Sequence, residues 1–189
     1  DKHICNLKNK GKILTLICAY MFKKTKHIIP NHYISDYDNV LIVHKCVPFK
    51  IEFVVRAYIT GNTITSLWTH YNNGERNYCG IDFPDNLKKN QKLVEPVITP
   101  TTKDIEDIPI SKEEIINRNY MTQKECDFVY EKAMKLFKYG QKMADNAGFI
   151  LVDTKYEFGK DENNNIILID EIHTCDSSRY WIKKTYENR

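Results

Sequence analysis

The residues best suited to chemistry lie between residues 150 and 181. Alternation along ILVDTKYEFGK places Asp153, Lys155 and Glu157 on one face of an expected strand. A polar DENNN turn follows, and a second apolar run, IILI, ends at Asp170 and Glu171. Such a hairpin can hold carboxylates from both strands beside a lysine. Paired carboxylates suit Mg²⁺ bound to substrate phosphates, because Mg²⁺ usually takes one or two protein carboxylates in such sites.

Two further stretches offer groups for binding an anion. Asp176 and two serines precede Arg179, so hydroxyls and a guanidinium lie together. The serines can equally be turn residues. Arg56 lies in a β-branched and aromatic strand expected from residue 51 to 60. It is either a second anion ligand or a buried structural arginine, although Glu52 on the same face is too far along the strand for an easy pair.

Length and composition are those of an ordinary soluble globular protein. The chain has 189 residues, enough for one large or two small domains. No apolar run approaches the roughly 18 residues that a bilayer span needs, and the N-terminal residues lack the apolar segment of a signal peptide. A net charge of +3, without basic residues interleaved with aromatics, does not indicate nucleic-acid binding. We expect a cytoplasmic protein without membrane or nucleic-acid partners, whose six scattered cysteines are reduced and mostly buried.

The N-terminal part is expected to form one helix and two strands. Residues 13–22, ILTLICAYMF, have helical spacing and precede a basic KKTK. Residues 27–35 and 40–46 have the composition of short strands split by a DYDN turn. Pro48 cannot continue a strand ladder, so we place a domain boundary there, between residues 1–47 and 48–189. Several prolines predict a loop-rich section from about residue 80 to Asp107.

Two capping boxes predict the later helices. Ser111 with Glu114 begins a short helix, and Thr122 with Glu125 begins a long one over residues 123–146. Gly148 ends the long helix. Its expected inner stripe consists of Cys126, Val129, Ala133, Leu136, Phe137, Gly140 and Ala144. The helix leads directly into the hairpin, so we expect the two to pack together.

Five blocks in order resemble the SAICAR synthetase family, the phosphoribosylaminoimidazole-succinocarboxamide synthases. They are KGKILTLICAYMF, IEFVVRAYITGN, EPVITPTTKDIED, LVDTKYEFG and LIDEIHTCDSSRYW, and together they span nearly the whole chain. The resemblance implies an α+β fold in which part of a small, mostly antiparallel lid domain joins a larger mixed α/β domain, with an ATP cleft between them. We expect the family's N-terminal lid strands and C-terminal helical stretch to be missing from residues 1–189.

The resemblance also implies roles for the hairpin residues. Glu157 and Asp170 would hold Mg²⁺ bridging ATP phosphates, and Lys155 would contact the transferred phosphate. Asp153 would orient the imidazole amine of the substrate or the water shell of the metal. The alternative is that Glu157 and Asp170 are solvated strand charges, and that Asp153 and Lys155 form a surface ion pair of little energetic value.

The remaining site residues likewise follow from the resemblance. Arg56 and Arg179 would clamp the ribose 5′-phosphate of the substrate through bidentate donors. Backbone groups near the domain boundary would meet adenine, at Lys45, Cys46 and Pro48. The rest of the expected substrate-binding set consists of Asn62, Lys103, Asp107, Asp176, Ser177 and Ser178.

The implied activity is that of an ATP-dependent, amide-forming ligase of purine biosynthesis. It would join L-aspartate to the carboxylate of carboxyaminoimidazole ribotide (CAIR) through an acyl phosphate, with ATP and Mg²⁺ as cofactors and SAICAR, ADP and phosphate as products. Two alternatives stay open. One is a small-molecule phosphotransferase of related architecture, and the other is an inactive nucleotide-binding or scaffold domain. The sequence leaves a homo-oligomer possible.

Overall fold

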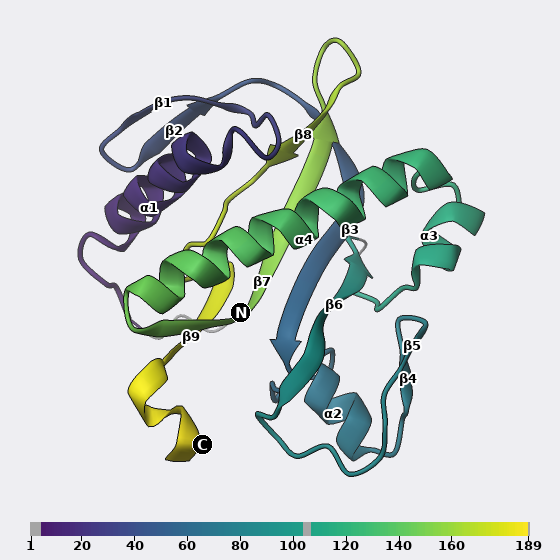
Figure 1. The fold of residues 1–189 in the computed structure, drawn as a ribbon. Helices are drawn as coiled ribbons and strands as arrows, with labels where there is room; N and C mark the ends of the chain where they lie inside the picture. The colour runs from purple at the N-terminus through teal and green to yellow at the C-terminus, as the bar shows by residue number, and fades with distance from the viewer. Residues whose placement is uncertain (1–4, 104–106, 189) are drawn as a thin grey trace.

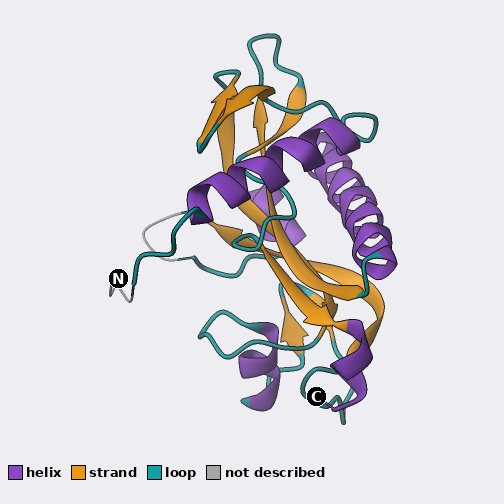
Figure 2. Cartoon of the chain, turned by 90° about the vertical axis from the view of Figure 1, so that its left-hand side faces the viewer, coloured by secondary structure: helices purple, strands orange, loops and turns teal. Residues whose placement is uncertain are grey.

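The computed structural model describes residues 5–103 and 107–188 (Figures 1 and 2). A central antiparallel sheet has the spatial order β6-β3-β7-β8, and β9 also pairs with β7. Its strands are β3 (Val47–Tyr58), β6 (Lys92–Thr102), β7 (Phe149–Lys160), β8 (Ile166–Ile169) and β9 (Ser178–Ile182). The long β7 pairs with β8 near its end and with β9 near its start. Together with the helices, this sheet confirms the expected α+β class.

The long helix α4 (Gln123–Asn146) covers one face of the sheet (Figure 1). Its expected start and end are confirmed, and Thr122 and Glu125 form the capping box. The buried positions on α4 are those expected from the sequence: Cys126, Val129, Ala133, Leu136, Phe137, Gly140 and Ala144. Tyr156 and Phe158 of β7 join the same hydrophobic core. Because side chains alternate along a strand, Lys155 and Glu157 face the opposite side of the sheet.

The N-terminal part packs onto this core. Helix α1 (Lys10–Thr25) is longer at both ends than expected, and its Cys18 and Phe22 belong to the same hydrophobic cluster as β3, β7 and α4. The hairpin strands β1 (Tyr33–Tyr37) and β2 (Val40–Val43) are shorter than expected. Asn31 forms a parallel bridge with Leu168, which ties this part to the edge of the sheet at β8.

Two expectations about proline in strands are wrong, whereas the domain boundary placed at residue 48 stays a prediction. Strand β3 begins at Val47 and runs through Pro48, which lies opposite Gly159 before a shift in the register. Strand β6 includes Pro96 and Pro100, in a section expected to be loop. Both cases have the same reason. Proline is tolerated at the start of a strand and on an edge strand, where its missing N–H costs no ladder hydrogen bond, and β6 is at an edge.

The smaller elements complete the chain. They are α2 (Leu67–Asn72), β4 (Asn77–Tyr78), β5 (Ile81–Asp82), α3 (Lys112–Asn117) and the 3₁₀ helix η1 (Lys183–Asn188). The cysteines are free thiols as expected, but the expectation that most are buried is wrong: Cys18 and Cys126 are buried, whereas Cys5 and Cys175 are exposed. Among the described helices, none combines the length and apolarity needed to cross a bilayer.

A buried histidine joins the segment after β8 to the core. His173 is 3% exposed, and one of its ring nitrogens is hydrogen bonded to the hydroxyl of Tyr156. Gly140 gives it room, because a Cβ at this position of α4 would lie 2.5 Å from the imidazole. Burial lowers the pKa of His173 to about 3. The imidazole is therefore neutral in the folded protein at ordinary pH.

This lowered pKa predicts a pH-dependent loss of stability. The unfolded chain binds a proton on His173 near the ordinary pKa of 6.5, whereas the folded protein binds it only near pH 3. Stability present above pH 6.5 is therefore lost as the pH falls. We expect this group to lower the free energy of unfolding by about 2 kcal/mol between pH 7 and pH 5. In urea unfolding, His173→Gln should lose about 2 kcal/mol less over that interval; an equal loss in both proteins contradicts the prediction.

Candidate functional site

Strand register places charged side chains in two rows on the sheet face opposite α4. In one row, Arg56 of β3 lies opposite Asp153 of β7, which lies opposite Arg179 of β9. In the other row, Glu52 lies opposite Glu157. All of these positions share one face because they alternate with the buried core positions of their strands. The three-stranded register thus brings together residues separated by more than a hundred positions in the chain.

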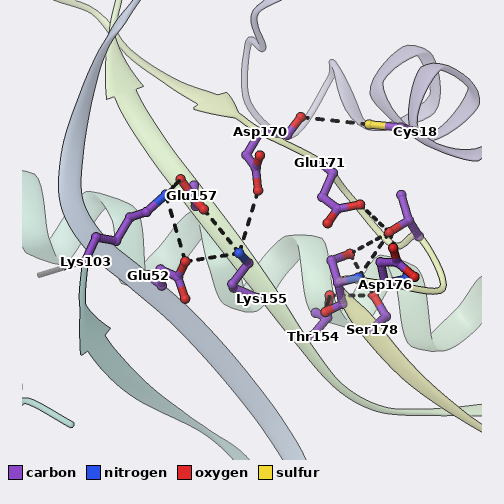
Figure 3. A network of polar contacts seen from close by, with 12 residues as sticks. Cys18, Glu52, Lys103, Thr154, Lys155, Glu157, Asp170, Glu171, Asp176 and Ser178 are labelled. Carbon is purple, nitrogen blue, oxygen red and sulfur yellow. Dashed lines mark hydrogen bonds and ion pairs between the residues drawn. The ribbon is translucent and has the colours of Figure 1, made fainter. Parts of the chain in front are cut away.

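Five residues around the second row form what we call the charge cluster: Glu52, Lys103, Lys155, Glu157 and Asp170 (Figure 3). The Nζ atom of Lys155 lies 3.0 Å from Glu52, 3.2 Å from Glu157 and 3.8 Å from Asp170. The Nζ atom of Lys103 lies 2.5 Å from Glu157 and 3.9 Å from Glu52. Three carboxylates thus surround two ammonium groups, so the cluster keeps a net negative charge when all are ionised.

The pKa shifts in the charge cluster reflect this imbalance. Burial, together with the nearby charge of Glu157 and against the effect of Lys155, raises the pKa of Asp170 to about 6. For Glu157, burial acts to raise the pKa, but the hydrogen bond from Lys103 and the charges of both lysines outweigh it and lower the pKa. Glu157 is therefore the firmly ionised carboxylate. Asp170 is the group that would gain most from an added cation.

The charge cluster fits a divalent cation in donor chemistry and in charge. Glu157 and Asp170 offer the hard oxygens that Mg²⁺ prefers, and the net negative charge favours a cation. Among the described residues, no group of three or more His, Cys, Asp or Glu side chains forms a complete metal site.

The first row lines a hollow of about 390 Å³ beside the charge cluster. The hollow is lined by Val54, Arg56, Asp153, Thr154, Lys155, Asp176, Ser177, Ser178 and Arg179. The Oδ2 atom of Asp153 lies 3.6 Å from the Arg56 guanidinium and 3.5 Å from that of Arg179, yet it is buried without a hydrogen bond. Burial raises the pKa of Asp153, and the two arginines oppose this. A buried oxygen that lacks a hydrogen bond in this position suits a donor group of a ligand.

Three hydroxyl side chains line the hollow and hydrogen bond to one another (Figure 3). The hydroxyls of Thr154 and Ser178 are 2.7 Å apart, and that of Ser177 is 3.3 Å from that of Ser178. Thr174, which is fully buried, accepts backbone hydrogen bonds from Asp176 and Ser177 and so holds the turn before β9. Ser177 therefore belongs to the turn and Ser178 begins β9, and both line the hollow, while their role in binding an anion stays a prediction.

Other expected site residues lie outside these contacts. Lys45 and Pro48 are exposed, and the Cys46 thiol donates to the carbonyl of His44. Asp107 is exposed. Within the described part of the chain, no hydrogen bond or ion pair links these residues to the charge cluster.

Two further residues are at the border of the hollow. The side chain of Asn62 accepts a hydrogen bond from Lys89, and the preceding Gly61 packs near Arg179. Asp176 lines the hollow, but its carboxylate pairs with Lys10 of α1 at 2.8 Å on the surface. Asp176 therefore lines the hollow, whereas Asn62 only follows a residue that lies near Arg179, and each side chain has a partner within the chain.

Glu52 is the site residue that the sequence analysis missed. It was considered only as a partner of Arg56, whereas it pairs with Lys155, and Arg56 pairs with Asp153 and donates to Thr99. A signal was present: Glu52 and Arg56 are polar positions on the same face of an otherwise apolar strand. The missing information was the register, which decides the facing residue on the next strand.

Fold and site together define a class of α+β proteins in which a lysine–carboxylate cluster lies beside an arginine-lined hollow. Among solved structures, a SAICAR-synthase from Saccharomyces cerevisiae complexed with SAICAR matches with a TM-score of 0.82 and 32% identity, over 95% of this chain and 64% of that one. A SAICAR synthetase (Type-2) in complex with ADP matches with a TM-score of 0.80 and 28% identity, over 96% and 71%.

Sequence comparison gives the same result. The family model for SAICAR synthetase matches residues 2–189. A phosphoribosylaminoimidazole-succinocarboxamide synthase from Legionella pneumophila (strain Paris) is 53% identical over 100% of this chain and 61% of the relative. A chloroplastic one from Vigna aconitifolia is 51% identical over 100% and 56%. The chain therefore belongs to the SAICAR synthetase family, and it spans about 60% of the length of these curated relatives.

The two arginines that flank Asp153 differ in exposure, and we therefore predict different contributions to stability for Arg56 and Arg179. The side chain of Arg56 is 9% exposed and that of Arg179 is 41% exposed. Arg56→Met should lower the free energy of unfolding by about 3 kcal/mol, because it removes a buried guanidinium that pairs with Asp153 and donates to Thr99. Arg179→Met should cost less than about 1 kcal/mol. Urea unfolding at neutral pH measures both, and equal losses contradict this division.

Proposed function

We propose that this chain carries the nucleotide- and substrate-binding core of an ATP-dependent ligase. The ligase joins L-aspartate to the carboxylate of CAIR and releases SAICAR, ADP and phosphate. The observation that carries the proposal is the position of the charge cluster directly beside the arginine-lined hollow, with Lys155 part of both. A phosphoryl group held at the cluster would thus lie next to a substrate held in the hollow. The bound SAICAR and ADP named for the two solved relatives agree with this.

In this proposal the hollow holds the ribotide. Arg56 and Arg179 bind the 5′-phosphate, because a guanidinium matches phosphate oxygens through paired donors. Ser177 and Ser178 add hydroxyl donors. Asp153 accepts a hydrogen bond from the imidazole amine through its otherwise unpaired Oδ2 atom. Asn62, Asp176 and, from an exposed position outside the hollow, Asp107 complete the set.

The charge cluster binds the nucleotide phosphates. Glu157 and Asp170 would hold Mg²⁺, which when bound neutralises phosphate charge and polarises the transferred phosphoryl group. Lys155 and Lys103 keep their positive charges beside the carboxylates, where they stabilise the charge that develops on phosphate oxygens. Lys155 also remains protonated: although burial lowers its pKa, the hydrogen bond and charge of Glu52 outweigh burial and raise it.

The reaction then proceeds in two steps. A carboxylate oxygen of CAIR forms a bond to the γ-phosphorus of ATP, and the bond to the bridging oxygen breaks, so ADP leaves with the electron pair. The aspartate nitrogen attacks the resulting acyl carbon, the carbon–oxygen bond to phosphate breaks, and the nitrogen loses a proton. The chain's contribution is mainly position and charge, as is usual for phosphoryl transfer.

The proposal also includes the organisation of the chain. Residues 1–47 would belong to the lid domain and residues 48–189 to the central domain, with backbone groups of Lys45, Cys46 and Pro48 at adenine between them. The protein would act in the cytoplasm on small-molecule substrates, as a monomer or a homo-oligomer.

Turnover with and without aspartate tests the proposal. With ATP, Mg²⁺ and CAIR present, phosphate release should require L-aspartate and should yield SAICAR. A stable phosphorylated product formed without aspartate would instead indicate a phosphotransferase. Absence of ATP binding in Mg²⁺ would indicate a scaffold.

Asp170→Asn tests the cation assignment. Asparagine keeps the size of the side chain and tolerates the same backbone conformation, but it removes the charge. We expect turnover to fall by at least about a hundredfold, in line with loss of several kcal/mol of charge stabilisation. Thermal unfolding should change little. Unchanged turnover would refute the role of Asp170.

A further inference from the structure

Asp170 has a backbone conformation that few side chains adopt. It directly follows β8, and its φ of +64° lies in the left-handed region. Three residues later His173 has a φ of +53°. Non-glycine residues keep such conformations where surrounding contacts hold them, and they occur often at functional sites. The bend between these residues therefore depends on partners from other parts of the fold.

The partners of Asp170 come from the N-terminal part of the chain. The Sγ atom of Cys18, a buried residue of α1, lies 4.0 Å from the Asp170 carbonyl oxygen (Figure 3). Burial raises the pKa of this thiol, and the neighbouring backbone of Ile172 opposes this. Burial lowers the pKa of the His32 imidazole, and the neighbouring backbone of Asp170 opposes this. Cys18 thus contacts the bend on both sides of Glu171, and His32 contacts its first residue.

His32 is itself held in place. It is 9% exposed, and its ring packs edge-on against Phe22 of α1 with 5.2 Å between centroids. Its backbone N–H donates to the carbonyl of Leu168 in β8, and its own carbonyl accepts from His44. Helix α1, the segment just before β1 and strand β8 therefore meet next to Asp170.

We propose that Cys18 and His32 are positioning residues that fix the left-handed conformation of Asp170 and thereby aim its carboxylate at Glu157 and Lys155. The inference rests on the proposed function, in which Asp170 helps to hold the cation. A right-handed or extended Asp170 would direct the carboxylate elsewhere, because φ sets the direction of the side chain relative to β8. The N-terminal helix then sets the cation affinity of the site without touching the cation.

The chain offers a matched control for simple loss of packing. Cys18 and Cys126 are both buried helical thiols of the same hydrophobic cluster, at 2% and 0% exposure. Cys126 lies on α4, on the other side of the sheet from the charge cluster. Alanine at either position removes one sulfur atom from the core, so a purely structural role predicts similar effects of the two substitutions.

The test measures Mn²⁺ binding in the presence of ADP by electron paramagnetic resonance, alongside urea unfolding. Cys18→Ala should weaken Mn²⁺ binding about tenfold, as is usual for loss of a group that orients a ligand. Cys126→Ala should change it less than about twofold at a similar cost in stability. Equal effects of the two alanines on Mn²⁺ binding, or no effect of Cys18→Ala, would overturn the role of Cys18.

A second variant tests His32 separately. His32→Phe keeps a ring against Phe22 but removes the polar ring nitrogens beside the Asp170 backbone, and it should weaken Mn²⁺ binding severalfold; unchanged binding would overturn the role of His32. Asp170→Asn distinguishes failure of the proposed function from failure of the positioning role. If Mn²⁺ does not bind the unsubstituted protein with ADP, or binds Asp170→Asn equally well, the proposed function and the positioning role both fail. If Asp170→Asn alone weakens binding, only the positioning role fails.

Discussion

Lys155 and Lys103 hold together carboxylates that would otherwise repel one another, and the site depends on this interaction. The antiparallel register of β3 and β7 places Glu52 directly opposite Glu157. Like charges in such a pair destabilise a sheet. The ammonium groups of Lys155 and Lys103 each lie within 3.9 Å of both carboxylates. The cluster is therefore a neutralised pair to which Asp170 adds one uncompensated charge.

The division of the sheet into two faces makes this arrangement possible. One face is buried beneath α4, where Tyr156, Phe158 and the helix stripe supply the apolar contacts. The other face is then free to carry charged residues, because the stability of the fold does not depend on covering it with apolar side chains. The segment after β8 crosses between these environments: Asp170 faces the cluster, while His173 enters the core.

The sequence predicted those features that depend on local pattern. The α4 boundaries and its buried stripe followed from one capping box and a period of 3.6 residues, and the hairpin followed from alternation around a polar turn. Ligand-type residues such as Glu157 and Arg179 were recognisable by their chemistry and by family resemblance. What failed depended on the position of a strand within the sheet: Pro48, Pro96 and Pro100 disrupt a central strand but not a strand start or an edge.

Pairing across strands could not be read from the sequence. Glu52 was missed, and the partner of Arg56 was identified only when the β3–β7 register was known. The left-handed conformation of Asp170 had no signal either, because its partners Cys18 and His32 lie more than a hundred residues away. These contacts depend on long-range topology, which local periodicity does not determine.

In the proposed function, the charge cluster binds nucleotide phosphates through a divalent cation. Calorimetric titration of the protein with ADP, in the presence and absence of Mg²⁺, tests it most directly. Mg²⁺ should tighten ADP binding at least about tenfold, and Glu157→Gln should abolish this gain. Equal ADP affinity with and without Mg²⁺, or a gain that Glu157→Gln retains, would contradict the account.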